Sequence, residues 1–168
     1  MAAFVIDTNV LLIADGQHDS ISIDCYETCL LRLSNWSAAD RVVLDDQFEI
    51  AREYQHKLNP KGGKTVAQAF LKALLQDPAR RLLVSLTPEP ARGYDAFPDD
   101  PDLAHFDPAD RKFIAAAVAS PESAPILQAA DCKWLGWAPA LQRHGLRLDF
   151  LCPKDLARFA ANKGLTPP

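Results

Sequence analysis

Four acidic side chains, far apart in the sequence, fall where strands end or helices begin, so we expect them at one edge of a sheet. Two carboxylates about 4 Å apart repel by roughly 4 kcal/mol at an effective dielectric near 20, so such a cluster is best explained as a cation site. Mg²⁺ and Mn²⁺ prefer oxygen ligands, activate water and stabilise charge on phosphate. The pattern therefore favours metal-dependent phosphodiester hydrolysis, with these metal ligands and catalytic residues: Asp7, Glu53, Asp110 and Asp131.

Four further polar residues near these acids are secondary candidates. Glu49 shares a helix face with Glu53 at a spacing of four, and Asp107 precedes the helix that carries Asp110. Thr8 and Asn9 follow Asp7 and could orient a ligand or a bound water. Each acid taken alone also has a structural explanation as a helix cap or as a charge favoured by a helix dipole.

The elements that would position these residues alternate between strands and helices along 168 residues, a length that suits one domain, residues 1–168. Hydrophobic patterning predicts strands at 4–6, 41–44, 81–86, 125–130 and 146–151. It predicts helices at 23–36, 48–58, 64–75, 108–119, 134–143 and 153–162. This alternation predicts an α/β fold, a three-layer α/β/α protein with a central, mainly parallel five-stranded sheet. In such sheets ligands bind outside the carboxyl ends of the strands.

The segments between these elements differ in charge and composition. A break is predicted at 59–63, and the Pro- and Asp-rich stretch 87–107 is predicted to be a long loop. Residues 1–51 carry 2 basic and 9 acidic side chains, whereas residues 52–92 carry 8 basic and 3 acidic ones. The basic segment supplies candidate RNA-binding lysines beside an acidic pocket, although a merely solvated helix face explains it too: Lys57, Lys61, Lys64 and Lys72.

Four cysteines are too few for a disulfide scaffold, and we expect reduced, mostly buried thiols. Cys25 and Cys29 would share one helix face, and a zinc site is favoured less because no Cys-x-x-Cys pair occurs. No apolar run reaches the roughly 18 residues of a membrane helix. The apolar stretch 4–14 contains Asp7 and has no basic residue before it, which argues against a signal peptide. We therefore expect a soluble cytoplasmic protein.

The order of these motifs resembles that of the PIN-domain nucleases, which include the VapC-type toxin ribonucleases. The segment Val5-Ile6-Asp7-Thr8-Asn9 is similar to the opening motif of that family, and Glu53-Tyr54 to its second acid. Asp110 with the Ala-rich segment 113–117 resembles the third acid, and the segment 130–134 resembles the fourth. The resemblance covers nearly the whole chain. It implies a PIN-like fold, Mg²⁺ or Mn²⁺ as cofactor, and an endoribonuclease acting on RNA.

Two features depart from the family pattern and keep alternatives open. The family often has a second aspartate in the last motif, where this chain has Lys133, and the chain is longer than a minimal toxin in the region 59–107. A catalytically weak PIN-like scaffold that binds RNA or a protein partner is therefore the first alternative. A haloacid-dehalogenase-type phosphatase is the second, with Asn9 in the place of its general acid. An antitoxin or regulator protein and a homodimer are open as partners, and no membrane is expected.

Overall fold

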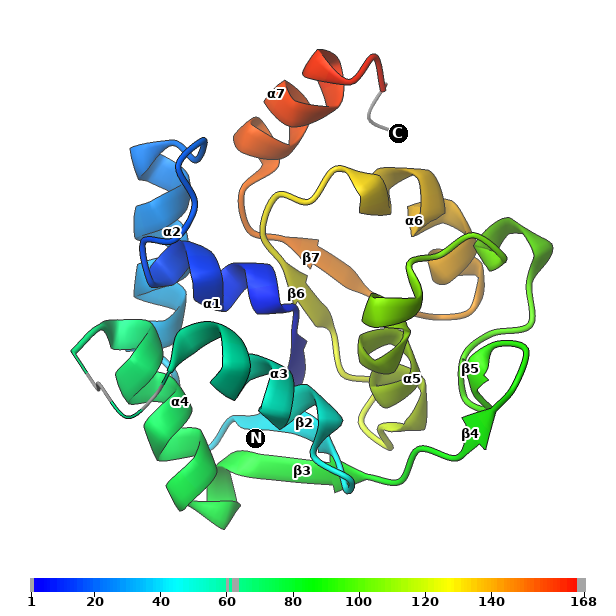
Figure 1. The fold of residues 1–168 in the computed structure, drawn as a ribbon, viewed down its shortest axis with the longest axis horizontal. Helices are drawn as coiled ribbons and strands as arrows, with labels where there is room; N and C mark the ends of the chain where they lie inside the picture. Colours follow the sequence, from blue (N-terminus) through cyan, green and yellow to red (C-terminus); the bar gives the residue numbers. More distant parts are fainter. Residues whose placement is uncertain (1, 60, 62–63, 166–168) are drawn as a thin grey trace.

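Five parallel strands form the central sheet in the order β3-β2-β1-β6-β7, flanked by helices (Figure 1). The computed structural model describes residues 2–59, 61 and 64–165. The strands are β1 Ala3–Ile6, β2 Arg41–Asp45, β3 Arg81–Val84, β6 Ile126–Gln128 and β7 Leu148–Phe150. The three-layer α/β/α class predicted from the sequence is confirmed, and all neighbouring strands pair in parallel.

The strand order places β1 at the centre of the sheet. The chain builds outward from β1 to β2 and β3, and then returns to the other side of β1 for β6 and β7. The side chains of β6 are buried along its whole length, as expected for a strand covered on both faces. The change of direction between β1 and β6 is the switch point at which ligands bind in folds of this kind.

Six of the seven α-helices in the described residues follow the predicted pattern. They are α2 Ile23–Ser34, α3 Glu49–Leu58, α4 Val66–Gln76, α5 Arg111–Ala119, α6 Lys133–Arg143 and α7 Pro153–Asn162. The predicted helix 108–119 begins with a 3-10 turn, Pro108–Asp110, which Asp107 caps by accepting from the Ala109 N–H. The predicted break at 59–63 lies partly outside the described residues, which omit 60, 62 and 63.

Helix α1, Thr8–Ala14, was not predicted, because the sequence pattern indicates only a strand followed by polar residues. Asp7 begins this helix by accepting a hydrogen bond from the Asn9 N–H. The apolar residues that follow are buried at helical spacing, among them Val10, Leu11 and Ala14. A turn of helix therefore starts directly at the carboxyl end of β1.

The stretch 87–107, predicted to be a loop, contains the hairpin of β4 Pro88–Glu89 and β5 Gly93–Tyr94 and a 3-10 turn, Pro101–Leu103. Three buried apolar side chains, Phe97, Leu103 and Phe106, anchor it to the core. Arg111 donates to the backbone carbonyls of Phe106 and Ala104 and holds the last part of the stretch against α5. The segment is therefore packed, and it delivers Asp107 to the start of the following helix.

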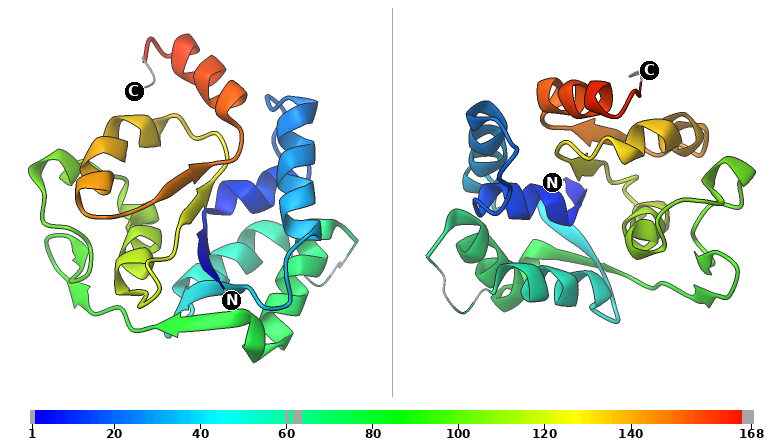
Figure 2. Two further views of the ribbon diagram at one scale, coloured as in Figure 1. Left: turned by 180° about the vertical axis from the view of Figure 1, so that it is seen from behind. Right: turned by 45° about the horizontal axis from the view of Figure 1, so that its top comes forward.

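The expectation of four reduced thiols is wrong. Cys25 of α2 and Cys152, just before α7, form a disulfide across 127 residues of sequence. Two views of the ribbon show α7 beside α2 (Figure 2), and Ser22 donates to Asp155 at the same junction. The buried thiol of Cys29 lies 3.9 Å from the Cys152 sulfur. Burial, with a smaller effect of Asp155, raises the pKa of Cys29 to about 12, so this thiol stays protonated.

Candidate metal and catalytic site

Asp7 and Asp131 lie on either side of the switch point of the sheet. Asp7 directly follows β1, and its backbone N–H donates to Leu127 of β6 at 2.9 Å. Asp131 lies three residues after the end of β6, where its backbone N–H donates to the side chain of Gln128 at 3.0 Å. Since β1 and β6 pair in parallel, their carboxyl ends bring the two acids to one edge. The sequence-based expectation for these two positions therefore agrees with the structure.

Asp7 is the most deeply buried acid of this group, with 4% of its surface exposed. Among the described residues, the Asn9 N–H donates a hydrogen bond to the Asp7 carboxylate at 2.9 Å. Burial first, and then the charge of Asp110, raises its pKa to about 8, with smaller increases from Asp131 and Glu53. The acids therefore act on one another electrostatically, and the metal-free protein holds a proton at Asp7 near neutral pH.

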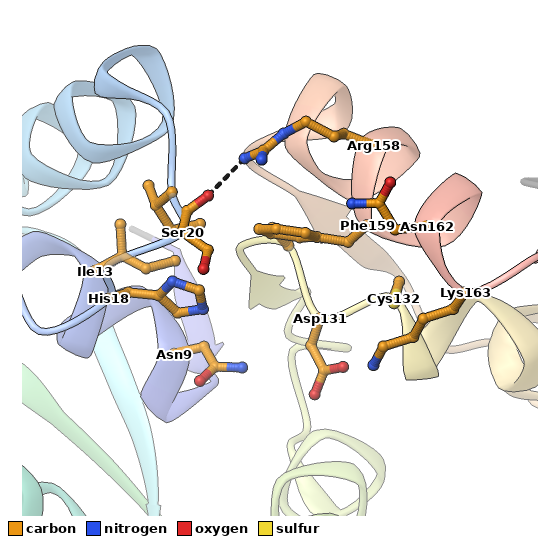
Figure 3. A pocket seen from close by; sticks show the side chains of 12 residues that line it. Asn9, Ile13, His18, Ser20, Asp131, Cys132, Arg158, Phe159, Asn162 and Lys163 are labelled. Carbon is orange, nitrogen blue, oxygen red and sulfur yellow. Dashed lines mark hydrogen bonds between the residues drawn. The ribbon is translucent and has the colours of Figure 1, made fainter.

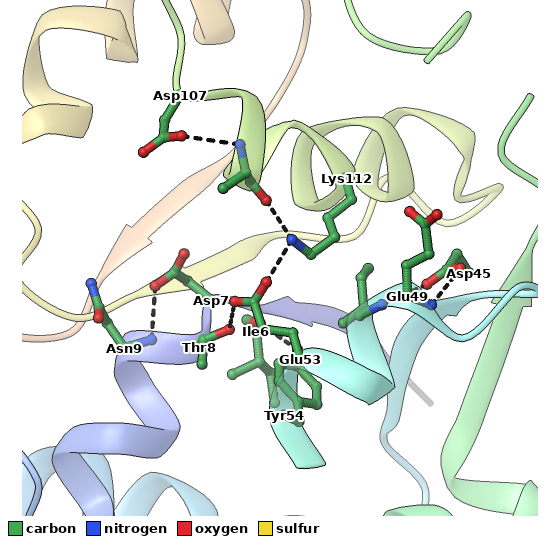
Figure 4. Close-up of polar contacts among 12 residues, drawn as sticks. Ile6, Asp7, Thr8, Asn9, Asp45, Glu49, Glu53, Tyr54, Asp107 and Lys112 are labelled. Atoms are coloured by element: carbon green, nitrogen blue, oxygen red, sulfur yellow. Dashed lines mark hydrogen bonds and ion pairs between the residues drawn. The ribbon is translucent and has the colours of Figure 1, made fainter. Parts of the chain in front are cut away.

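Glu53 reaches this edge from α3, which is fixed against β1 by Tyr54. The buried Tyr54 hydroxyl donates to the backbone carbonyl of Ile6, directly before Asp7. The Glu53 carboxylate accepts from the Thr8 hydroxyl and pairs with the Lys112 ammonium at 2.6 Å. Figure 4 shows these side chains meeting from α1, α3 and α5. Lys112 was not selected from the sequence, although a lysine in the first turn of a helix is disfavoured by the helix dipole and indicates an acid nearby.

Asp110 precedes α5, and its side chain makes no cap hydrogen bond with this helix. Burial and the neighbouring charge of Asp107 raise its pKa to about 6, while Lys133 partly offsets this increase. The Asp107 carboxylate lies 3.4 Å from the Lys133 ammonium. Asp110 is therefore held near the other acids without the cap bond that would explain it structurally.

Lys133 stands where the family pattern has a second aspartate. Its ammonium lies 3.6 Å from Asp131 and 3.4 Å from Asp107 and thereby joins the two carboxylates. The charge of Asp131, followed by the Asp107 hydrogen bond, raises the pKa of this lysine against the opposing effect of burial. Lys133 therefore stays charged and neutralises part of the acidic edge.

Comparisons with protein-family models, curated proteins and solved structures found no match for this chain. The resemblance to the PIN-domain nucleases stays a prediction. The site must therefore be judged by its own chemistry.

The acids in the described part of the chain do not form a closed metal cage. Among the His, Cys, Asp and Glu side chains of the described residues, one group places three potential metal-ligand atoms within 4.8 Å of one another. It consists of Cys25, Cys29 and Cys152. The acids are spaced more widely than this. Mg²⁺ keeps several of its waters and uses only one or two carboxylates together with substrate phosphates, so a closed protein cage is not required. If all were ionised, five acids would face two lysines here: Asp7, Glu53, Asp107, Asp110, Asp131, Lys112 and Lys133.

The remaining predicted residues lie around this centre. Glu49 begins α3 and accepts a hydrogen bond from the Tyr94 hydroxyl of β5. Asp45, at the end of β2, is buried and accepts from the N–H groups of Glu49 and Ile50. The four lysines predicted to bind RNA are all exposed, and their role stays a prediction: Lys57, Lys61, Lys64 and Lys72.

Proposed function

We propose that this protein is a metal-dependent endoribonuclease that hydrolyses phosphodiester bonds with Mg²⁺ or Mn²⁺. The observation that carries the proposal is the burial of Asp7 at the switch point of the sheet, where Asp110, Asp131 and Glu53 all raise its pKa. A buried carboxylate facing three others is costly unless a cation compensates the charge. Lys112 and Lys133 pair with Glu53 and Asp131, and no described lysine or arginine pairs with Asp7 or Asp110.

The acids of the site would bind the cation, and the neighbouring polar residues would orient them. One or two of the carboxylates of Asp7, Glu53, Asp110 and Asp131 would bind the cation directly, and the others would face its bound waters. When bound, the cation would polarise the phosphate and make water a better nucleophile near neutral pH. Thr8 orients Glu53 through its hydroxyl, and Gln128 positions the backbone of Asp131. Asp107 holds Lys133, whose ammonium supplies positive charge for the phosphate backbone.

A second candidate function is a PIN-like scaffold that binds RNA or a protein partner without cleavage. The pairs Lys112–Glu53 and Lys133–Asp131 favour it, because they already neutralise two of the four proposed ligands. The difference between the two functions is whether a divalent cation displaces these ammonium groups. A homodimer or a protein antitoxin or regulator stays a prediction in either case.

Asp110→Asn tests the proposal because it removes one charge and keeps nearly the same shape. In chelator at pH 7.5 we expect a melting temperature no lower than that of the wild type, since the pKa of Asp110, about 6, shows the cost of its charge. Saturating Mn²⁺, at about 100 times its Kd, should stabilise the wild type by about 2.7 kcal/mol and the variant much less. Mn²⁺-dependent cleavage of single-stranded RNA should fall at least about 100-fold.

Asp24→Asn is the matched control, because Asp24 is an exposed aspartate in the first turn of another helix, α2. It should respond to Mn²⁺ and cleave RNA like the wild type. If Asp110 only favours its helix dipole, Asp110→Asn should lose a few tenths to about 1 kcal/mol in chelator and still respond to Mn²⁺. That pattern would contradict the proposed metal site.

None of the described helices combines the length and the apolar character that a membrane span requires. A cytoplasmic location stays a prediction, and the disulfide between Cys25 and Cys152 is of a kind that is rare in reducing compartments.

A further inference from the structure

Three cysteine sulfurs meet where α7 packs beside α2. Cys25 and Cys29 lie one turn apart on the same face of α2, and Cys152 directly precedes α7. All three side chains are buried, and their sulfurs lie within 4.8 Å of one another. The disulfide joins Cys25 to Cys152 and leaves Cys29 as a free thiol beside it. The disulfide therefore accounts for two of the three sulfurs at this place.

The spacing of the sulfurs is that of thiolates around one zinc ion. With Zn–S bonds of about 2.3 Å and tetrahedral angles, two ligand sulfurs lie about 3.8 Å apart. The Cys29 sulfur lies 3.9 Å from the Cys152 sulfur, so this pair already has the required separation. Once the disulfide is reduced, the sulfurs of Cys25 and Cys152 repel each other out of bonding distance and move toward the same spacing.

Hydrogen bonds other than the disulfide hold the ligand-bearing segments together. Asp155 of α7 accepts from the Ser22 N–H at 2.8 Å and from the Ser22 hydroxyl at 2.5 Å. Arg158 donates to the Ser20 carbonyl at 2.6 Å (Figure 3) and pairs with Asp155 at 3.0 Å. Ser22 also caps α2 by accepting from the Cys25 N–H. The three sulfurs should therefore stay close to one another when the disulfide is reduced.

A cavity of about 200 Å³ connects the sulfurs with the surface. Cys25 and Cys152 line it, together with the polar side chains of Thr28 and Asp155. A zinc ion held by three thiolates requires a fourth ligand, which a water from this cavity would supply. The cavity is also a path by which the ion enters, as a usable metal site requires. The position of Cys152 at the N-terminus of α7 favours its thiolate form through the helix dipole.

We propose that reduction of the disulfide creates a zinc site in which Cys25, Cys29 and Cys152 bind Zn²⁺ through their thiolates. A dithiol supplies the two electrons and two protons that convert the disulfide into two thiols, and is itself oxidised to a disulfide. Zn²⁺ then binds the three sulfurs and releases their three protons to solvent. A disulfide oxidant reverses both steps, because the bond between Cys25 and Cys152 removes two of the three ligands.

This site is independent of the proposed ribonuclease and takes a different metal. Thiolates select Zn²⁺, whereas carboxylates suit Mg²⁺ and Mn²⁺. Disulfides persist in oxidising compartments and are rare in reducing ones. The same three cysteines would therefore fasten α7 to α2 in both conditions, by a disulfide when oxidised and by zinc when reduced.

Zinc binding by the reduced and the oxidised protein tests the proposal. The full chain is reduced with a phosphine in the absence of oxygen, then equilibrated with Zn²⁺ in excess Mg²⁺, and its bound zinc is counted. We expect one Zn²⁺ per chain after reduction and none before it, and a higher melting temperature of the reduced protein with Zn²⁺. Co²⁺ in place of Zn²⁺ should give a thiolate-to-cobalt charge-transfer band, which carboxylate ligands do not produce.

Cys29→Ala separates the zinc site from the disulfide, because it removes one ligand and leaves Cys25 and Cys152 able to bond. When oxidised, its melting temperature should stay close to that of the wild type. When reduced, its affinity for Zn²⁺ should fall at least about 100-fold. Cys132→Ala is the matched control, since Cys132 is the other buried free cysteine and lies outside the sulfur group. It should bind zinc like the wild type.

Equal zinc affinity of the reduced wild type and Cys29→Ala would overturn the zinc site, as would a Co²⁺ complex without the thiolate band. If reduction unfolds the chain, Zn²⁺ must restore its circular dichroism, and a failure to do so overturns the site as well. None of these outcomes bears on the ribonuclease, whose activity is measured with Mn²⁺ and without reductant.

Discussion

Replacing Asp7 by asparagine should abolish RNA cleavage and, in chelator, make the protein more stable at pH 8. The pKa of Asp7 is about 8 in the folded protein and near 3.8 ordinarily, so between these values the folded state binds a proton that the unfolded state releases. Stability must then fall as the pH rises through this window. Asp110, whose pKa is about 6, also makes stability fall with rising pH, but only up to about pH 6. Between pH 6 and 8 the fall in stability is therefore assigned to Asp7. There the wild type should lose on the order of 1 kcal/mol per pH unit, and less as the pH approaches 8.

Urea unfolding of Asp7→Asn at pH 6, 7 and 8 measures this effect. Asparagine keeps an oxygen that accepts the Asn9 N–H, so the cap of α1 survives and this part of the slope should disappear. Asp149→Asn, at an exposed position of β7, removes one charge without burial and should leave the slope unchanged. A variant that is less stable than the wild type at pH 8 would show that the Asp7 carboxylate stabilises the fold and is not held there for a cation.

Reducing the disulfide should cost about 2–5 kcal/mol of unfolding free energy, because Cys25 and Cys152 close a loop across 127 residues. Unfolding by guanidinium with and without a phosphine reductant measures this loss. The Cys25→Ser/Cys152→Ser variant should be as unstable as the reduced wild type, and its stability should not change when the reductant is added.

A count of free thiols in denaturant decides whether this bond is present. Of the four cysteines, Cys29 and Cys132 are free, so two thiols should react before reduction and four after it. Four reactive thiols in the unreduced protein, or a stability that does not respond to reductant, would contradict the disulfide. The result would then agree with the reduced thiols expected from the sequence.

The central part of the site was predictable because parallel sheets follow a topological rule. The apolar runs before Asp7 and Asp131 identified strands, and the carboxyl ends of parallel strands share an edge. Asp110 followed from the predicted helix 108–119, because it lies in the first turn of that helix. Local pattern and topology were enough for these positions, because each acid lies within a few residues of an element end.

Contacts between distant segments could not be predicted in the same way. The spacing of Cys25 and Cys152 contains no information on their contact, and the ion pair between Lys112 and Glu53 depends on how α5 packs beside α3. The contact between the rings of His18 and Phe159, 6.0 Å apart between centroids, depends in the same way on how α7 packs. Such features require the three-dimensional packing of helices on the sheet.

The anomalous scattering of crystals soaked in Mn²⁺ tests the proposed metal site most directly. The account predicts a peak about 2.1 Å from carboxylate oxygens of Asp7 and at least one of Asp110 and Asp131, and no such peak in Asp7→Asn crystals. It also predicts that Lys133 moves away from Asp131, which it contacts at 3.6 Å without metal. An acid cluster without a peak, in which Lys112 still pairs with Glu53 and Lys133 with Asp131, would contradict the nuclease and support a scaffold that binds without cleaving.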